Sequence, residues 1–301
     1  MRTGPRRLTR GAAILAAVIF SACSGPGGPA SPARPSPAEP SDSGLAGGSA
    51  APTAALSPTP GALVGVIVME NRGYTEAIAQ PYIGTLASKY TVATQYFAVS
   101  HPSLPNYLAL TAGSTFDITD DAYHRLPTGG LGHELTAAAV PWHAYMEGMS
   151  RGCLDSPFPY AVKHNPFAYY GGSCPANVTS AATLPADLAG GASGLVWVTP
   201  DLCNDGHDCS TSTGDRWLSS TVPMFTASPR WQAGGALFIV WDEDDGGGDN
   251  RVVLLAITPH PGSHTIGGHF DHYSLLATVE DLLGVPRLGR AVGAASLPVQ
   301  R

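Results

Sequence analysis

Residues 63–69 read LVGVIVM, an apolar and largely β-branched run that ends abruptly in Glu70 and Asn71. Such a run predicts a strand that is covered on both faces, as in a parallel sheet between two layers of helices. The carboxylate and the amide should then lie just outside the carboxyl end of the strand, where open α/β sheets bind their ligands. A polar residue that merely ends a strand is the simpler interpretation of this stretch alone.

A second run of the same kind supports the functional interpretation. Residues 236–241 read ALFIVW and are followed by four acidic residues, 242–245. Two buried strands that deliver acids to the same sheet edge predict a cation site there. Other segments alternate between the two types: strands are expected at 91–97, 140–146, 195–199 and 252–258, and helices at 74–90, 132–139 and 273–283. This alternation predicts a three-layer α/β/α sandwich with a mostly parallel central sheet.

The first 60 residues differ in composition from the rest. Residues 1–23 resemble an export signal of the lipoprotein type, with a basic leader, an apolar core too short to span a membrane, and small residues before Cys23. Plain secretion without a lipid on Cys23 is the alternative. Residues 24–60 are rich in Pro, Ser, Ala and Gly and predict a disordered tether. Residues 61–301 are then one α/β domain, secreted or held at the cell envelope on the outer face of the membrane.

The charge of the chain excludes one class of partner. The whole chain carries −7, and five arginines and two acidic residues precede residue 61, which leaves 11 basic and 21 acidic residues, or −10. Affinity for phosphate backbones depends on basic surface, so we expect no nucleic-acid partner. We expect a monomer that touches the membrane only through a lipid on Cys23.

Four cysteines of the folded part form two local pairs, Cys153 with Cys174 and Cys203 with Cys209. In an exported chain this spacing predicts two disulfides. A zinc knot, which would require a tighter CxxC spacing, is the disfavoured alternative.

Residues 100–107, SHPSLPNY, place Ser103 between two prolines that restrict the backbone. A hydroxyl at such a strand-to-helix junction is a common way to present a nucleophile. An N-cap of the following helix is the competing interpretation.

The candidate ligands Glu70, Asn71, Asp242 and Glu243 offer only oxygen atoms, which suits one Ca²⁺, Mg²⁺ or Mn²⁺ ion. Such an ion would activate the Ser103 hydroxyl, and His207 would donate a proton to the leaving group. A lone loop histidine can equally be an ordinary surface group. The acidic, glycine-rich loop at 242–249 also has a separate interpretation as a structural calcium loop.

Six motifs occur in a characteristic order. They are Glu70-Asn71-Arg72, Ser103-Leu104-Pro105-Asn106, KHNPF at 163–167, NDGHD at 204–208, Asp242-Glu243 with its glycine-rich loop, and LLATVEDLLGVP at 275–286. Together they resemble the bacterial phosphoesterase family that includes acid phosphatases and phospholipases C, over about residues 63–288. The resemblance implies an alkaline-phosphatase-like fold and, as substrate, a small phosphate ester or a phospholipid headgroup.

The resemblance also implies roles for particular residues. Glu70, Asn71, Asp242 and Glu243 would hold the metal together with Ser103, which would attack phosphorus. Asn106 would hold a phosphate oxygen, and His164 and His207 would donate protons or support the metal ligands. Tyr74 and Tyr107 depart from the phospholipase branch, which leaves the phosphomonoesterase branch at least as well supported.

Two further functions compete with this one. A catalytically inactive, calcium-binding surface protein could keep the same fold, although a serine at 103 argues against it. A sulfatase or diesterase would use the same scaffold, but the chain lacks the Arg that sulfatases carry shortly after their nucleophile.

Overall fold

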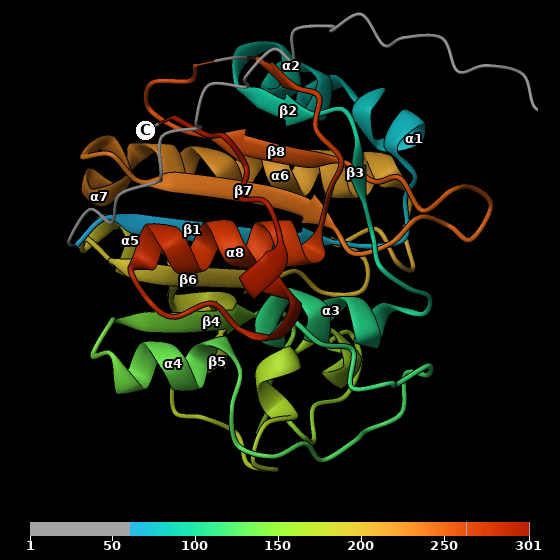
Figure 1. Ribbon diagram of the computed structural model, residues 1–301, viewed down its shortest axis with the longest axis vertical. Coiled ribbons are helices and arrows are strands. Elements are labelled where there is room, and N and C mark those ends of the chain that lie inside the picture. Colours follow the sequence, from blue (N-terminus) through green and yellow to red (C-terminus); the bar gives the residue numbers. More distant parts are fainter. Residues whose placement is uncertain (1–60, 263, 301) are drawn as a thin grey trace, which may run out of the picture. The chain divides into compact units, whose positions relative to one another are not determined.

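The computed structural model describes residues 61–262 and 264–300 (Figure 1). The export signal, Cys23 and the tether that we predict within residues 1–60 lie outside the described residues. Of the described helices, none is both long enough and apolar enough to cross a membrane.

The described residues form an eight-stranded sheet (Figure 1). Its strands are β1 (Leu63–Met69), β2 (Thr91–Ala93), β4 (Trp142–Met146), β5 (Val178–Ser180), β6 (Gly194–Thr199), β7 (Ala236–Trp241), β8 (Leu254–Ile257) and β9 (Thr265–Ile266). The spatial order is β5-β4-β6-β1-β7-β8-β2-β9. Every pairing is parallel except those of β8 with β7 and with β2, so the predicted mostly parallel sheet is confirmed. A small separate sheet pairs β3 (Tyr96–Phe97) with β10 (Phe270–Asp271).

Helices cover both faces of the large sheet, as a three-layer sandwich requires (Figure 1). They are α1 (Tyr74–Ile78), α2 (Pro81–Lys89), α3 (Ser103–Ala112), α4 (Leu131–Ala137), α5 (Leu184–Ala189), α6 (Thr211–Ala227), α7 (Pro229–Gln232) and α8 (His272–Leu283), with short 3-10 turns η1 (Val162–His164), η2 (Pro166–Ala168), η3 (Ala181–Thr183) and η4 (Gly289–Gly293). α3 packs against α8 on one face, and α6 lies on the other with α2, α5 and α7 beside it.

The centre of the sheet is fully covered. All seven residues of β1 and all six of β7 are buried, as their unbroken apolar runs predict. Gly65 in β1 marks where α6 approaches most closely, because a Cβ there would lie 2.9 Å from the ring of Phe225 and 2.8 Å from Leu237. This tight packing fixes the central strands, whose ends carry the candidate site.

Two predicted elements are each divided in the structure. The helix predicted for 74–90 is two helices, because Pro81 begins α2 and holds Gln80 in an extended conformation with φ −70° and ψ 143°. The strand predicted for 91–97 contributes β2 to the large sheet and β3 to the small one. The chain therefore leaves the large sheet after β2, and β3 leads from the small sheet into the turn before Ser103.

Smaller corrections concern boundaries and direction. The strand predicted for 140–146 begins at Trp142, and the helix predicted for 132–139 spans Leu131–Ala137. The run at 252–258 forms β8 only from Leu254, and it runs antiparallel to its neighbours.

Candidate active site

The acids that follow β1 and β7 lie side by side. Parallel pairing places Met69 opposite Trp241, and the Asp242 amide continues the ladder by donating to the Met69 carbonyl at 2.9 Å. The chain then turns at Asn71, whose φ of 50° is left-handed, and the Asn71 amide donates to Asp242 Oδ1 at 3.2 Å. Glu70 and Asp242 are both fully buried. The predicted meeting of these two strand ends is thus present in the structure.

Ser103 lies between two carboxylates from these strand ends. Its Oγ is 3.1 Å from Glu70 Oε2 and 3.1 Å from Glu243 Oε1. Ser103 is the first residue of α3, and the N-cap is Pro102. The N-cap interpretation of Ser103 is therefore wrong: its side chain points to the acids and makes no capping bond with the helix backbone.

A third strand contributes to the same cluster. The loop after β6 carries Asp205, whose carbonyl accepts the Glu70 amide at 2.9 Å and whose side chain is buried. Asp205 Oδ2 lies 3.3 Å from His164 Nδ1, and His164 Nε2 lies 3.3 Å from Glu70 Oε1. We call Glu70, Asp205, Asp242 and Glu243 the acidic cluster. Asp205, His164 and Glu70 bring their ligand atoms within 4.8 Å of one another, a spacing that suits a metal ion.

Several buried polar atoms around the cluster lack a hydrogen bond within the described part of the chain. They are Asn71 Oδ1, His164 Nε2, Asp205 Oδ2 and Asp242 Oδ2. Buried polar groups are normally satisfied, so these four atoms of the site require an explanation. All four atoms are common metal ligands: His164 and Asp205 belong with Glu70 to the group whose ligand atoms lie within 4.8 Å of one another, and Asn71 and Asp242 lie at the adjoining strand ends. The residues present therefore fit a divalent cation.

The electrostatics lead to the same conclusion. Burial raises the pKa of Glu70, with the nearby Asp205 adding to the effect. Burial and the charge of Glu70 likewise raise the pKa of Asp242, and burial raises the pKa of Asp205. Burial lowers the pKa of His164, which keeps the imidazole neutral and able to bind a metal. A cation would offset the repulsion among these buried carboxylates.

Two residues that we did not predict as site residues support the acids. The Tyr107 hydroxyl donates to Glu70 Oε1 at 2.5 Å, and its ring stacks on His164 with centroids 5.4 Å apart. The ring of His101 contacts Glu243 Oε2 through Nδ1 at 2.5 Å and Asp244 Oδ1 through Nε2 at 3.3 Å. These contacts hold the carboxylate planes in place, as ligand-supporting groups do in metal sites.

Asn106 has a different position from the one we expected. Its Oδ1 accepts the amides of Val99 and Ser100 at 3.0 and 3.1 Å, and its Nδ2 donates to the carbonyls of Ser100 and Pro102 at 2.9 and 3.2 Å. These four bonds use the amide within the turn that precedes Ser103. Asn106 thus shapes the turn, and its side chain has no polar group left over for a phosphate oxygen.

His207 lies at the edge of the site beside the ammonium group of Lys163. Its Nδ1 contacts Asp208 Oδ1 at 2.7 Å, and its Nε2 lies 3.1 Å from Lys163 Nζ. Because the carboxylate accepts at Nδ1, the Nε2 lone pair faces the ammonium of Lys163. Lys163 also binds Asp121 Oδ2 at 2.8 Å, and Asp121 Oδ1 accepts the Leu104 amide at 3.0 Å.

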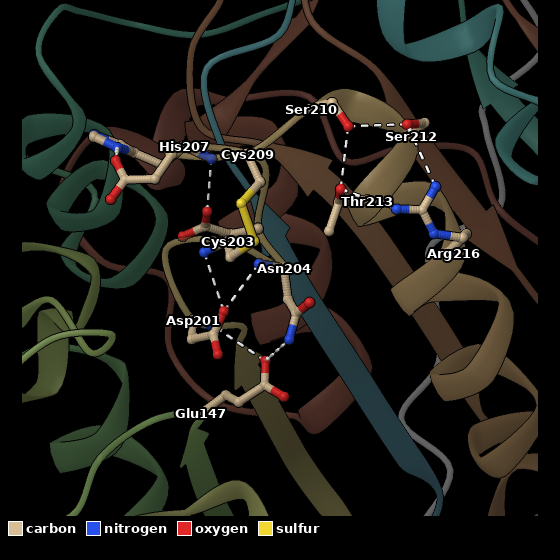
Figure 2. Close-up of a disulfide and its surroundings, with 12 residues drawn as sticks. Glu147, Asp201, Cys203, Asn204, His207, Cys209, Ser210, Ser212, Thr213 and Arg216 are labelled. Atoms are coloured by element: carbon tan, nitrogen blue, oxygen red, sulfur yellow. Dashed lines mark hydrogen bonds and ion pairs between the residues drawn. A yellow bond between two sulfur atoms is a disulfide. The ribbon is translucent and has the colours of Figure 1, made fainter.

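The loop that carries Asp205 and His207 is closed by a disulfide (Figure 2). Cys203 is bonded to Cys209, and Cys153 to Cys174, so both predicted disulfides are present. Asp201 Oδ1 accepts the amides of Cys203 and Asn204 at 3.1 and 2.9 Å. Figure 2 also shows Glu147, at the end of β4, holding the Asn204 side chain at 3.0 Å. This loop is thus tied both to itself and to the sheet.

The acid after β6 could have been found from the sequence. The predicted ligands were polar residues that come directly after β1 and β7, whereas Asp205 follows the end of β6 by six residues. Since β6 pairs with β1 in parallel, its carboxyl end faces the same edge. No sequence signal marked Tyr107, His101 or Asp121, whose roles depend on side-chain direction.

The architecture matches that of the alkaline phosphatase superfamily. A protein of that superfamily from Vibrio parahaemolyticus superposes with a TM-score of 0.59 at 11% identity, covering 81% of this chain and 72% of the other. The lipoteichoic acid synthase LtaP from Listeria monocytogenes superposes with a TM-score of 0.53 at 10% identity, covering 78% and 76%. At this identity the likeness establishes the fold alone.

Sequence comparison defines the family. Residues 68–286 match the Phosphoesterase family, and the chain belongs to it. A phosphatidylinositol-3-phosphatase from Mycobacterium tuberculosis is 33% identical over 245 residues, which cover 76% of this chain and 79% of the relative. A phosphate-repressible acid phosphatase from Penicillium chrysogenum is 27% identical over 244 residues, 74% of this chain and 59% of the relative. The chain is therefore a hydrolase of phosphoric esters, as the motifs predicted.

Proposed function

We propose that this chain is an exported, metal-dependent phosphatase in which Ser103 is the nucleophile. The observation that carries the proposal is the position of the Ser103 hydroxyl, 3.1 Å from a carboxylate oxygen on each of two neighbouring strand ends. A serine with no chemical role would have no reason to be buried against two acids whose charged forms are already disfavoured.

The cation would be held by Glu70, Asn71, Asp242 and Glu243 together with Ser103, as the motifs suggest. The unpaired Asn71 Oδ1 and Asp242 Oδ2 support this set. The unpaired atoms of His164 and Asp205 extend it on the other side of Glu70. When bound, a divalent cation supplies positive charge that favours serine alkoxide and stabilises the phosphoryl oxygens.

The chain's own groups carry the remaining steps. A carboxylate oxygen next to Ser103 takes the hydroxyl proton while Oγ bonds to phosphorus, and the bond from phosphorus to the leaving oxygen breaks. His207 gives that oxygen a proton from its doubly protonated form, after Nε2 has taken up a proton and turned away from the Lys163 ammonium that it faces in the structure. Water then attacks the phosphoserine, which releases phosphate and restores the Ser103 hydroxyl.

The substrate that we propose is a phosphate monoester, including the phosphorylated headgroup of a lipid. Two features support it: the relatives are a phosphatidylinositol-3-phosphatase and acid phosphatases, and the site presents one nucleophile in a confined acidic cluster. The chain spans only 59% of the fungal acid phosphatase, so the substrate is a proposal for this chain and is not carried over from that enzyme.

The two disulfides support a location in an oxidising compartment outside the cytoplasm. A lipid on Cys23 would additionally hold the domain at the envelope, and mass spectrometry of the protein from its own cell would detect that lipid.

Hydrolysis of an aryl phosphate by the Ser103→Ala variant tests the nucleophile. We expect the loss of at least about a thousandfold in kcat/KM, the size typical of removing a catalytic nucleophile, with an unchanged far-UV circular dichroism spectrum. Ser219→Ala, on the exposed face of α6, is the matched control and should keep full activity. Turnover by Ser103→Ala at the wild-type rate would end the proposal.

Chelation separates this proposal from the inactive calcium-binding alternative. For a phosphatase, removing the divalent cation abolishes hydrolysis, and adding it back restores hydrolysis. A protein that melts at a lower temperature after chelation but never hydrolyses any phosphate ester would support the binding role.

A further inference from the structure

The carboxylate of Asp121 accepts hydrogen bonds from two separate donors, one of which is the amide that follows the proposed nucleophile. One carboxylate oxygen accepts the Leu104 amide at 3.0 Å, and the other accepts Lys163 Nζ at 2.8 Å. Leu104 directly succeeds Ser103 and is the second residue of α3, so its N–H has no partner within the helix. An anion therefore already lies at the start of α3, on the amide that follows Ser103 and on a lysine from η1.

The two donors are of the kind that bind phosphate. A free N–H at a helix start and a lysine ammonium both favour anions, and charge-assisted bonds to them are short and strong. Lys163 is half-buried, and its charge acts on Glu70 and Asp242 as well as on Asp121. Lysine is normally charged at neutral pH, and Asp121 pairs with this ammonium at 2.8 Å.

A phosphate that enters the acidic cluster needs a positively charged side chain such as Lys163. Glu70, Asp205, Asp242 and Glu243 all repel a phosphate dianion, and Lys163 lies on the wall between Asp121 and His207. Asp121 keeps 30% of its side chain exposed, so it can turn into water without burying its charge. The Asp121 carboxylate is thus bonded to both donors, and it is exposed enough to be displaced from them.

We propose that Asp121 occupies the phosphate-binding donors of the substrate-free enzyme, and that the phosphate of the substrate displaces it from Leu104 N and Lys163 Nζ. Asp121 is then a built-in competitor that sets phosphate affinity, and Lys163 is a binding residue for the substrate. This inference rests on the proposed function, because Ser103 defines where the phosphorus must lie. In the opposite arrangement Asp121 would only hold Lys163 in place, and removing its charge would weaken phosphate binding.

Binding of inorganic phosphate distinguishes the two arrangements. Calorimetry on the full chain with its divalent cation bound gives the Kd, and product inhibition of aryl phosphate hydrolysis gives a second value. We expect Asp121→Asn to tighten phosphate binding by about tenfold, because one competing charge-assisted bond is weakened. Lys163→Met should weaken binding by about tenfold or more. Asp120→Asn, one residue away and bonded to His124, is the matched control and should change nothing.

An unchanged or weaker phosphate affinity in Asp121→Asn would overturn the inference, as would wild-type affinity in Lys163→Met. Asp121→Ala and Lys163→Gln serve as second variants if a first variant fails to fold. The calorimetric result does not depend on turnover, so it stands apart from the Ser103 experiment. If Ser103→Ala remains active, Ser103 is not the nucleophile. The phosphate affinities of the Asp121 and Lys163 variants relative to wild type are measured independently of that result.

Discussion

Glu70 is the residue on which the two halves of the site depend. Its Oε2 lies near the Ser103 hydroxyl, while its Oε1 accepts from Tyr107 and lies 3.3 Å from His164. The carboxyl is fully buried, and burial raises its pKa, whereas the bond from Tyr107 favours its charged form. Tyr107 thus keeps Glu70 both oriented and ready to bind a cation.

Removing the Tyr107 hydroxyl tests that role. Tyr107→Phe should weaken binding of the divalent cation by about 10- to 100-fold, the usual effect of losing a group that supports a metal ligand. A titration of the chelated protein with Mn²⁺ or Ca²⁺ measures it. Tyr145→Phe removes a tyrosine hydroxyl that also donates to a carboxylate, Asp187, at 2.9 Å, and it should leave cation affinity unchanged. Equal affinities in both variants would show that Tyr107 acts in packing only.

Strand direction made part of the site predictable from single residues. The sequence indicates Glu70 and Asp242 because a polar residue after a buried parallel strand must lie at the carboxyl edge of the sheet. The partners of Asn106 and the contact of Asp121 with Leu104 were not predictable, since both depend on how a turn folds back on itself.

Among the elements of the site, the loop from Asp201 to Cys209 is only loosely held by packing. Most of its residues are partly exposed, with Asp205 buried at its centre. By contrast, η1 carries His164 in a buried segment whose carbonyl accepts from Thr199 at 3.1 Å. The short disulfide therefore constrains the loop that carries Asp205 and His207, whereas the long one closes a segment of which residues 164–170 are already buried.

Deleting each disulfide should separate stability from activity. The chain-entropy relation gives about 3 kcal/mol for the Cys153–Cys174 loop and about 2 kcal/mol for the Cys203–Cys209 loop. We expect the Cys153→Ala/Cys174→Ala protein to lose more stability, and the Cys203→Ala/Cys209→Ala protein to lose more activity while folded. Urea unfolding and aryl phosphate hydrolysis, measured on both, check this. The reverse order of activity would show that the loop keeps its shape without its disulfide.

The sequence predicted most elements but not every direction. An unbroken apolar run shows that a strand is covered on both faces, and this holds equally for β7 and β8. It carries no sign of which way the strand runs, so the antiparallel β8 was not foreseen. The division of the helix at Pro81 could have been predicted, because the residue before a proline avoids helical geometry.

For the molecule as a whole, one buried carboxyl outside the acidic cluster makes the free energy of unfolding depend on pH. Glu280 lies in the middle of α8, is fully buried, and accepts only the Leu288 amide at 2.9 Å among the described residues. Burial raises the pKa of Glu280 to about 8. In the unfolded chain this carboxyl has a pKa of about 4.3 and releases its proton there, whereas the folded protein keeps the proton up to about pH 8. Because the folded state binds more protons between these two pKa values, the free energy of unfolding falls as the pH rises from about 4.3 to about 8.

The Glu280→Gln variant should lack this contribution. Between about pH 5 and pH 8, wild type should lose up to about 1.4 kcal/mol per pH unit more than the variant. Urea unfolding with the cation chelated in both proteins measures the difference, with Asp155→Asn, a carboxyl whose side chain is 89% exposed, as the control. Parallel stability curves for wild type and Glu280→Gln would mean that the Glu280 carboxyl stays charged when buried.

The pairing of Met69 with Trp241 has a consequence for the growing chain. A ribosome makes Glu70 and Ser103 early, but the partners of both, Asp242 and Glu243, are added about 140 to 170 residues later. Until β7 is inserted beside β1, Glu70 can meet only His164 and Asp205, and the half of the proposed cation site that Asp242 and Glu243 supply is missing. The proposed site is therefore completed only when β7 joins the sheet, and a chain truncated before Asp242 should not hydrolyse phosphate esters.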